Sequence, residues 1–209
     1  MSSADLGASS VVAAAVAAIR AGEVVVLPTD TVYGLVGTAY WAAGRDAVYG
    51  LKGRDSGKPS ALMVASLAVL FECVPELRGR PERMASTLLP GRYTLVLPNP
   101  ARRFAWLCGD EPTTIGVRMP ELTGTAETVL AVAAAVVATS ANVPGGPEPR
   151  TVSEIPEALR AGAAVVIDGG ELPGVPSTVI DLTERDPRVI REGSGDVDAA
   201  LARLAALRA

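Results

Sequence analysis

Two kinds of hydrophobic pattern alternate along the chain. Short apolar runs, several of them rich in β-branched residues, predict buried strands, and longer stretches with apolar residues at helical spacing predict helices. The predicted strands are residues 23–27, 61–65, 93–97, 114–118, 136–139, 163–167, 178–182 and 188–191, and residues 32–36 are expected to be extended or turning. The predicted helices are residues 42–51, 66–73, 81–89, 123–133, 153–160 and 196–208, preceded by a helix that Ser9 or Ser10 caps and that runs to Ile19.

The order of these elements predicts the fold class. Strands and helices are mixed along the whole length, and some strands follow one another directly, so we expect an α/β (α+β) fold with a twisted mixed β-sheet flanked by helices. A chain of 209 residues suits one such domain, expected at residues 8–207. Hydrophobic residues make up 49% of the chain and aromatic residues only 4%, so Val, Ala, Leu and Ile must build most of the core.

The composition of the chain argues against several kinds of site and several classes of protein. The sequence contains no His, and its two cysteines form no CxxC pair, so we predict no protein-bound metal site and no catalytic His. The formal net charge of −4 argues against a general nucleic-acid-binding protein. No apolar run is long enough to span a membrane, and the first ten residues lack the basic start of a signal peptide, which predicts a cytoplasmic protein.

A short loop concentrates positive charge. The segment KGRDSGKP (52–59) places Lys52, Arg54 and Lys58 close together beside two glycines. Such a loop suits a polyphosphate, because Arg offers a planar fork, Lys a mobile point charge and Gly a close backbone approach. It is not a Walker A loop, since its glycines are too close together and Pro59 stands where Ser or Thr is needed. An ordinary solvated loop is the alternative interpretation.

Polar residues also gather at the ends of predicted strands. The segment PTDT (28–31) follows the first strand, and TSAN (139–142) ends another. Ligands of α/β proteins bind at such ends, although turns and helix caps use the same residue types. Arg118 lies within an apolar strand, where it needs a carboxylate partner from the protein or from a ligand.

Taken together and in order, these and further segments resemble the YrdC-like family, the threonylcarbamoyl-AMP synthases. The matching segments are PTDTVYGL (28–35), LKGRDSGKP (51–59), PGRYTLVL (90–97), TIGVRMP (114–120), ATSAN (138–142), STVIDL (177–182) and IREG (190–193). One segment alone would be weak evidence, whereas the ordered set is highly specific. The resemblance is to the short, single-domain form of the family.

The resemblance implies a reaction. L-threonine, bicarbonate and ATP, with Mg²⁺ as part of the ATP complex, would give L-threonylcarbamoyl-adenylate and pyrophosphate. The adenylate would supply the threonylcarbamoyl group for an adenosine next to the anticodon of tRNA. Transient contact with tRNA or with the downstream transferase complex would then be expected.

The resemblance also implies roles for single residues by motif position. Arg118 would hold the threonine carboxylate, and Lys52 would neutralise phosphate. The expected threonine-binding residues are Thr31, Arg118, Ala138 and Ser177. The expected ATP-binding residues are Arg54, Lys58, Thr114, Ser140, Asn142 and Arg191, and the candidate catalytic residues are Lys52 and Arg54.

Four positions depart from the family pattern. Pro176 stands where Glu is frequent, and Glu148 stands where a small hydroxyl residue often meets ATP. Met63 replaces the His that longer members have near threonine, and Lys58 replaces a frequent Asn. These changes are expected to affect the finer contacts. The loop 143–150 is rich in Gly and Pro and is a candidate lid over the site.

Three other interpretations stay open at this point. The chain could be an RNA-binding or translation-associated module without catalysis, although its acidic balance and few aromatic residues argue against a broad RNA surface. It could be a carbamoyl-transfer domain of the hydrogenase-maturation type, but those are parts of longer chains with zinc-bearing segments. A riboflavin-pathway synthase of related fold would be expected to use His and acidic metal ligands.

Overall fold

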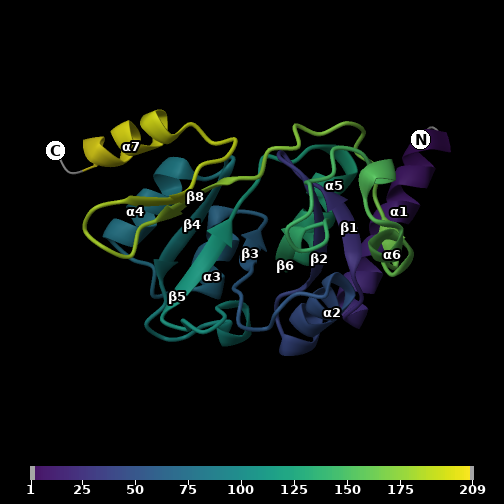
Figure 1. Cartoon of the computed structure of the whole chain (residues 1–209), viewed down its shortest axis with the longest axis horizontal. Helices are drawn as coiled ribbons and strands as arrows, with labels where there is room; N and C mark the ends of the chain where they lie inside the picture. The colour runs from purple at the N-terminus through teal and green to yellow at the C-terminus, as the bar shows by residue number, and fades with distance from the viewer. Residues whose placement is uncertain (1–2, 208–209) are drawn as a thin grey trace.

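A mixed nine-stranded sheet organises the computed structural model, which describes residues 3–207 (Figure 1). The strand order is β7-β1-β2-β6-β3-β5-β4-β8-β9. The strands are β1 (Val25–Pro28), β2 (Tyr33–Thr38), β3 (Ala61–Val64), β4 (Tyr93–Pro98), β5 (Thr114–Arg118), β6 (Ala135–Ser140), β7 (Val165–Val166), β8 (Thr178–Asp181) and β9 (Arg188–Arg191). β7 pairs with β1, β3 with β5 and β4 with β8 in parallel, and the other neighbours pair antiparallel.

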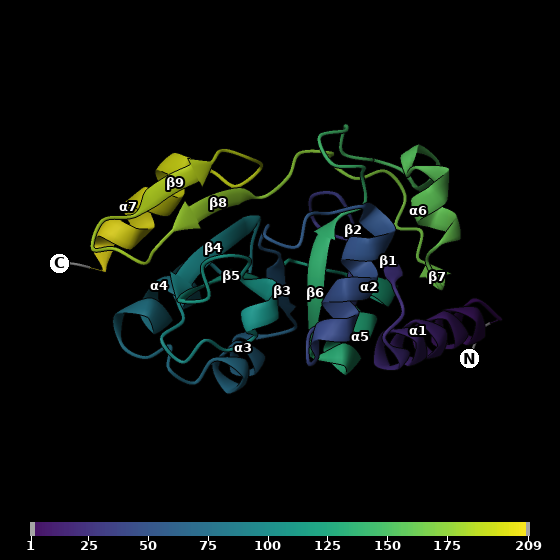
Figure 2. The ribbon, with the colours of Figure 1, turned by 60° about the horizontal axis from the view of Figure 1, so that its bottom comes forward.

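Seven α-helices and two short 3₁₀ helices flank this sheet within the described residues. The helices are α1 (Ser3–Ala21), α2 (Ala42–Lys52), α3 (Leu67–Cys73), α4 (Arg80–Leu88), η1 (Ala105–Leu107), α5 (Gly124–Ala133), η2 (Val152–Glu154), α6 (Glu157–Ala161) and α7 (Val197–Ala206). Figure 2 shows α4 and α7 at one end of the molecule and α1 at the other. Across residues 3–207, the structure contains no helix that combines the length and the apolar character needed to cross a membrane.

The two faces of the sheet are covered by different helices. On one face, α1 and α5 pack against each other and bury Val25, Val36 and Val136 of β1, β2 and β6. Neighbouring residues such as Val26 and Val137 point to the opposite face, because side chains alternate along a strand. That opposite face forms the larger core together with residues of α2, α3, α4 and α7.

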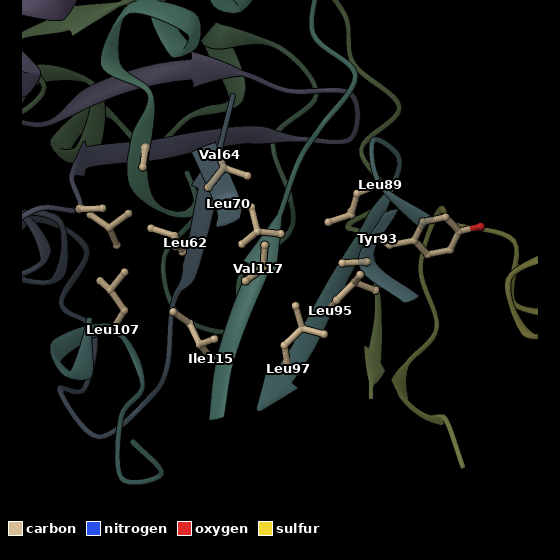
Figure 3. Close-up of a cluster of buried hydrophobic side chains, with 14 of the residues drawn as sticks. Leu62, Val64, Leu70, Leu89, Tyr93, Leu95, Leu97, Leu107, Ile115 and Val117 are labelled. Atoms are coloured by element: carbon tan, nitrogen blue, oxygen red, sulfur yellow. The ribbon is translucent and has the colours of Figure 1, made fainter. Parts of the chain in front are cut away.

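The strand β4 shows how part of the first face stays open. Its alternate residues Tyr93, Leu95 and Leu97 are buried in the larger core, and Figure 3 shows Leu95 and Leu97 beside Ile115 and Val117 of β5. The residues between them are only partly buried and line a cavity on the other side of the sheet. The period of two along β4 therefore separates the core from the candidate site.

Most predicted elements are confirmed, with small shifts at their ends. Residues 114–118 and 188–191 coincide with β5 and β9, and residues 32–36 lie mainly in β2. The predicted mixed α/β architecture, with helices flanking a mixed sheet, is confirmed as well.

Two helices were predicted with wrong boundaries. The first helix begins at Ser3 and not at a cap formed by Ser9 or Ser10, because Ser is only mildly unfavourable within a helix that Ala favours. The predicted helix 153–160 is divided into η2 and α6, since Pro156 lacks the N–H that a continuous helix needs there.

The remaining boundary differences lie at a strand and at the last helix. The predicted strand 163–167 is reduced to the two residues of β7, which pair only with β1. The last helix begins after its cap Asp196, whose carboxylate accepts a hydrogen bond from Ala199 N at 2.9 Å, and it ends at Ala206. Arg208, the predicted end of that helix, lies outside the described residues.

Candidate active site

A cavity of about 490 Å³ lies over the open face of the sheet. Its lining residues come from β2, β3, β4, β5, β6, β8 and β9 and from the loops at their ends. This volume falls within the usual range for small-molecule sites. Segments that are far apart in the sequence therefore meet at one place.

Small residues form the floor of the cavity. Ala61 of β3 lies opposite Ala138 of β6 in the sheet register, and Gly34 and Gly116 line the cavity on the neighbouring strands. A Cβ atom placed on Gly116 would meet no atom closer than 3.9 Å. The small residues at these positions leave room for a ligand directly above the sheet.

A buried arginine occupies one end of the cavity. Arg118, in β5, is 9% exposed and lines the cavity. Its Nη2 donates to Asp30 Oδ1 and to Thr31 Oγ1, each at 2.5 Å. Nη2 also lies 3.3 Å from Thr29 Oγ1, so the turn after β1 surrounds this nitrogen with oxygen atoms. The carboxylate that an arginine in an apolar strand requires is thus supplied by Asp30.

The electrostatics of Arg118 follow from this enclosure. Burial lowers the pKa of Arg118, and the charge of Asp30 opposes that change. A guanidinium group stays protonated in proteins, so Arg118 remains a cation. Its Nε is buried and has no hydrogen-bond partner among the described residues. Nη1 makes no hydrogen bond to the described residues and is not sealed off, so this nitrogen keeps donor capacity for a ligand in the cavity.

Ser177 and Arg191 form a second wall. Ser177 Oγ lies 2.8 Å from Thr94 Oγ1 of β4, in a hydrogen bond that either hydroxyl could donate. Arg191 Nη2, at the end of β9, donates to the Ser177 carbonyl at 2.7 Å. The antiparallel pairing of β8 with β9 brings this arginine to the cavity.

Lys52 lies behind the lining residues at the end of β6. Its Nζ lies 2.5 Å from the Ser140 carbonyl oxygen, 3.0 Å from Asn142 Oδ1, and 3.2 Å from both Thr139 Oγ1 and Ser140 Oγ. Lys52 is the last residue of α2, and only 5% of it is exposed. Its contacts fix the polar segment that ends β6.

The pKa of Lys52 is lowered to about 8. The largest cause is burial, the charge of Arg54 acts in the same direction, and the charge of Glu148 opposes both. All four oxygens around its Nζ belong to neutral groups. The dipoles of these neutral groups, and not a carboxylate in direct contact, therefore stabilise the charge of the Lys52 ammonium.

Arg54 brings a second cation to the cavity. Its Nη2 donates to the Pro59 carbonyl at 2.8 Å, and its guanidinium carbon lies 5.6 Å from the centre of the Tyr49 ring. The Tyr49 hydroxyl donates to the Lys58 carbonyl at 2.6 Å, which ties the loop to α2. Arg54 Nε is buried and has no hydrogen-bond partner in the part of the chain that the structure describes. Its Nη1 makes no hydrogen bond among the described residues and is not sealed off, so Arg54, like Arg118, keeps a donor for a ligand.

The structure brings most of the predicted site residues together. Thr31, Lys52 and Asn142 lie outside the lining but contact lining residues through hydrogen bonds. Lys58 is exposed and does not line the cavity. The predicted residues that line it are Arg54, Thr114, Arg118, Ala138, Ser140, Ser177 and Arg191. Their individual roles stay predictions.

Sequence reasoning missed several lining residues. Thr94 could have been found, because it is a polar residue at an alternate position of an otherwise apolar strand. Asp110 and Glu111 lie in a turn before β5 and line the cavity, but no local pattern distinguishes them from ordinary turn residues. Glu148, which the sequence already marked as a departure from the family pattern, lines the cavity too, and its Oε2 is buried without a hydrogen-bond partner among residues 3–207.

Two known proteins resemble this chain along most of its length. A threonylcarbamoyl-AMP synthase of Pyrococcus abyssi is 35% identical over 176 residues, which make up 84% of this chain and 52% of that protein. A putative threonylcarbamoyl-AMP synthase of Mycobacterium tuberculosis is 33% identical over 183 residues, or 87% of this chain and 83% of that protein. The chain thus spans about half the length of the first relative and most of the second.

A solved structure and a family model agree with these relatives. The crystal structure of P. abyssi Sua5 complexed with L-threonine superposes with a TM-score of 0.84 at 32% identity, covering 92% of this chain and 56% of that one. The Sua5, YciO and YrdC family model, described as "Telomere recombination", matches residues 17–193. With its ordered motifs, its fold and this match over most of its length, the chain belongs to the Sua5/YciO/YrdC family.

Proposed function

We propose that this protein is an L-threonylcarbamoyladenylate synthase, which forms L-threonylcarbamoyl-adenylate and pyrophosphate from L-threonine, bicarbonate and ATP. The observation that carries this proposal is a single cavity with arginines at separate places along its wall, each keeping hydrogen-bond donors for a ligand. The names of the relatives and the threonine complex of P. abyssi Sua5 support the same activity. The product would supply the threonylcarbamoyl group for an adenosine next to the anticodon of tRNA.

The amino-acid substrate fits the end of the cavity near Arg118. An arginine that retains free N–H groups suits a carboxylate, which accepts charge-assisted hydrogen bonds. The hydroxyl of Thr31 contacts Arg118 at this end, and Ser177 and Ala138 line the same cavity. Met63 borders the cavity but is fully buried, so its side chain packs in the core directly beneath the site.

The nucleotide fits the part of the cavity near Arg54 and Arg191. Arg54 offers its Nη1, which makes no hydrogen bond in the described chain and is not sealed off, and phosphate oxygens are strong acceptors for such a donor. The side chains of Thr114 and Ser140 add short polar groups along the same lining. Mg²⁺ would come as part of the ATP substrate, bound mainly by phosphate oxygens and water.

The chemistry that this site must support is an adenylate transfer. Threonine and bicarbonate combine to the N-carboxylate of threonine with loss of water. A carbamate oxygen then attacks the α-phosphorus, the bond from that phosphorus to the bridging oxygen breaks, and pyrophosphate leaves with the bonding electrons. The nucleophile is already an anion, so positioning and charge stabilisation matter more than a general base. A chain without His is compatible with this mechanism.

Lys52 has an indirect place in the proposed mechanism. Its contacts with Ser140 and Asn142 hold the end of β6 in the conformation that lines the cavity. Its positive charge also lies behind the site expected for the phosphates. We therefore assign Lys52 to positioning, and Arg54 to direct contact with ATP.

Pyrophosphate release tests the proposal. The purified protein would be incubated with ATP, Mg²⁺ and fresh bicarbonate, with L-threonine or with L-serine or without an amino acid. Release that needs both threonine and bicarbonate is expected. It should fall by about a hundredfold or more in Arg54→Ala and Arg118→Ala variants, because each removes a group aimed at a reacting substrate.

A surface arginine provides the matched control. Arg103 pairs with Glu76 on the surface at 2.8 Å and does not line the cavity, so Arg103→Ala should leave release unchanged. No threonine-dependent release from a folded wild-type protein would contradict the proposed reaction. An RNA titration at defined salt would then test the non-catalytic alternative.

A further inference from the structure

Asp30 is a buried carboxylate in direct contact with Arg118. Its side chain is 5% exposed, and its Oδ1 accepts from Arg118 Nη2 at 2.5 Å. Its second oxygen, Oδ2, accepts from the backbone N of Glu121 at 3.3 Å. Asp30 and Arg118 are 88 positions apart in the sequence, so the fold creates this pair.

The contacts of Arg118 are distributed unevenly over its guanidinium group. Nη2 has two N–H groups and lies near three acceptors, on Asp30, Thr31 and Thr29. Nη1 makes no hydrogen bond to the described residues and is not sealed off, whereas Nε is buried without a partner. One nitrogen of the guanidinium is therefore fixed by the protein, while another is left for a ligand.

The turn that contains Asp30 is itself fixed. Thr29 Oγ1 donates to the Val32 carbonyl at 2.6 Å, which leaves that hydroxyl an acceptor toward Arg118. The backbone N of Val32 donates back to Thr29 Oγ1 at 3.2 Å. Asp30 therefore lies on a hydrogen-bonded turn between β1 and β2, which restricts its movement.

From this geometry we propose that Asp30 is a positioning residue, which orients Arg118 so that its remaining N–H groups meet the carboxylate of the amino-acid substrate. The inference rests on the proposed function for the identity of that substrate. Without Asp30, the guanidinium could turn toward other oxygens of the turn, and the geometry of a two-point contact with the carboxylate would be lost.

Two substitutions at Asp30 test the inference. Asp30→Ala removes the carboxylate that contacts Arg118 and leaves the contacts of Arg118 with Thr29 and Thr31. Asp30→Asn keeps the shape of the side chain and an acceptor oxygen. For Asp30→Ala we expect the threonine KM to rise about tenfold or more, with kcat within about threefold, because binding geometry is lost before chemistry. Asp30→Asn should raise the threonine KM less, and the ATP KM should stay unchanged in both.

Asp181 offers a matched control. It is a largely buried carboxylate of the same sheet that pairs with Arg188 at 2.9 Å, but it does not line the cavity. Asp181→Asn should lower stability without changing the threonine KM. If Asp30→Ala changed all kinetic constants together, or left the threonine KM unchanged, a purely structural ion pair would be indicated and the proposal would be overturned.

Direct binding separates this inference from the proposed function. Calorimetry would measure the Kd of L-threonine and of L-threoninol, which lacks the carboxylate, for the wild type and for Asp30→Ala. Wild-type threonine binding without pyrophosphate release would contradict the proposed reaction alone. The positioning proposal expects Asp30→Ala to weaken threonine binding about tenfold and to abolish the preference for threonine over threoninol. A wild-type protein that binds neither compound would overturn the positioning proposal.

Discussion

Arg118 and Lys52 are two buried cations beside the same cavity, and the protein balances their charges differently. Arg118 faces the carboxylate of Asp30 at 2.5 Å, whereas the Lys52 ammonium meets only neutral oxygens. The chemistry of the two side chains explains the difference. Arginine cannot lose its proton in a protein and so requires a counter-charge when buried, while lysine can become neutral and can be held by dipoles.

The comparison assigns different functions to the two regions. The Arg118 region has a fixed charge and fixed geometry, which suits recognition of a substrate carboxylate. The Lys52 region has an adjustable charge, because its pKa of about 8 lies near the physiological range. Arriving phosphates would favour the protonated form of Lys52, so nucleotide binding and protonation should be coupled there.

The largest expected effect comes from breaking the Arg118 pair. Arg118→Ala leaves the Asp30 carboxylate buried without its counter-charge, which should cost about 3–5 kcal/mol of unfolding free energy. Urea denaturation would measure it. In the double variant with Asp30→Asn, part of this loss should be recovered, since no charge is left buried. A double variant as unstable as the sum of the two single variants would show that the pair is not coupled.

A smaller loss of stability is expected for Lys52→Met. The substitution keeps an apolar stem of similar length but leaves the Ser140 carbonyl and Asn142 Oδ1 without this donor. The cost should be no more than about 1–3 kcal/mol, because removing a buried ammonium also relieves its burial. A loss equal to that of Arg118→Ala, measured in the same urea series, would contradict the contrast between the two cations.

The pH dependence sharpens the same contrast. The folded-state pKa of Lys52, about 8, lies below its ordinary value of 10.5, so the unfolded chain binds more protons between these values. The stability of the wild type relative to Lys52→Met should therefore rise as the pH increases from about 8 to 10.5 and then level off. A flat difference across this window would contradict the lowered pKa.

Catalysis should respond to pH in the opposite sense. If the protonated Lys52 is the form that positions Ser140 and attracts phosphate, kcat/KM for ATP should fall as the pH rises through about 8. The Lys52→Met variant should have a low kcat/KM at every pH and should lack this alkaline limb, the fall above about pH 8. If kcat/KM for ATP fell in the same way in that variant, the fall would belong to the titration of another group.

Local patterns in the sequence predicted much of the fold. The β-branched runs at residues 114–118 and 188–191 predicted β5 and β9, because strand preference and burial act on the same side chains. Pro156 could have predicted the break between η2 and α6, but the apolar spacing was given more weight. Local sequence patterns therefore predicted most helices and strands. The error at residues 153–160 arose where two such patterns, the apolar spacing and the proline, disagreed.

The site was predicted less completely, for a different physical reason. An arginine in an apolar strand indicated a carboxylate partner, but no local pattern could select Asp30, which the fold brings from 88 residues away. Asp110 and Glu111 were missed because their place in the cavity depends on the packing of the loop before β5. Motifs predicted which residues carry chemistry, whereas the contacts among them follow from the sheet order.

Glu148 offers the smallest and most local test of the comparison. Its charge raises the pKa of Lys52, against the effects of burial and Arg54, and its Oε2 is buried without a hydrogen-bond partner in the described chain. Glu148→Gln should therefore lower the pKa of Lys52 further and move the alkaline limb of kcat/KM for ATP to lower pH. The ATP KM measured well below that limb should fall about two- to threefold, since a carboxylate near the expected phosphates is removed. A limb that moved to higher pH would mean that Glu148 does not act on Lys52 through its charge, and the Lys52 region would then be governed by burial and Arg54 alone.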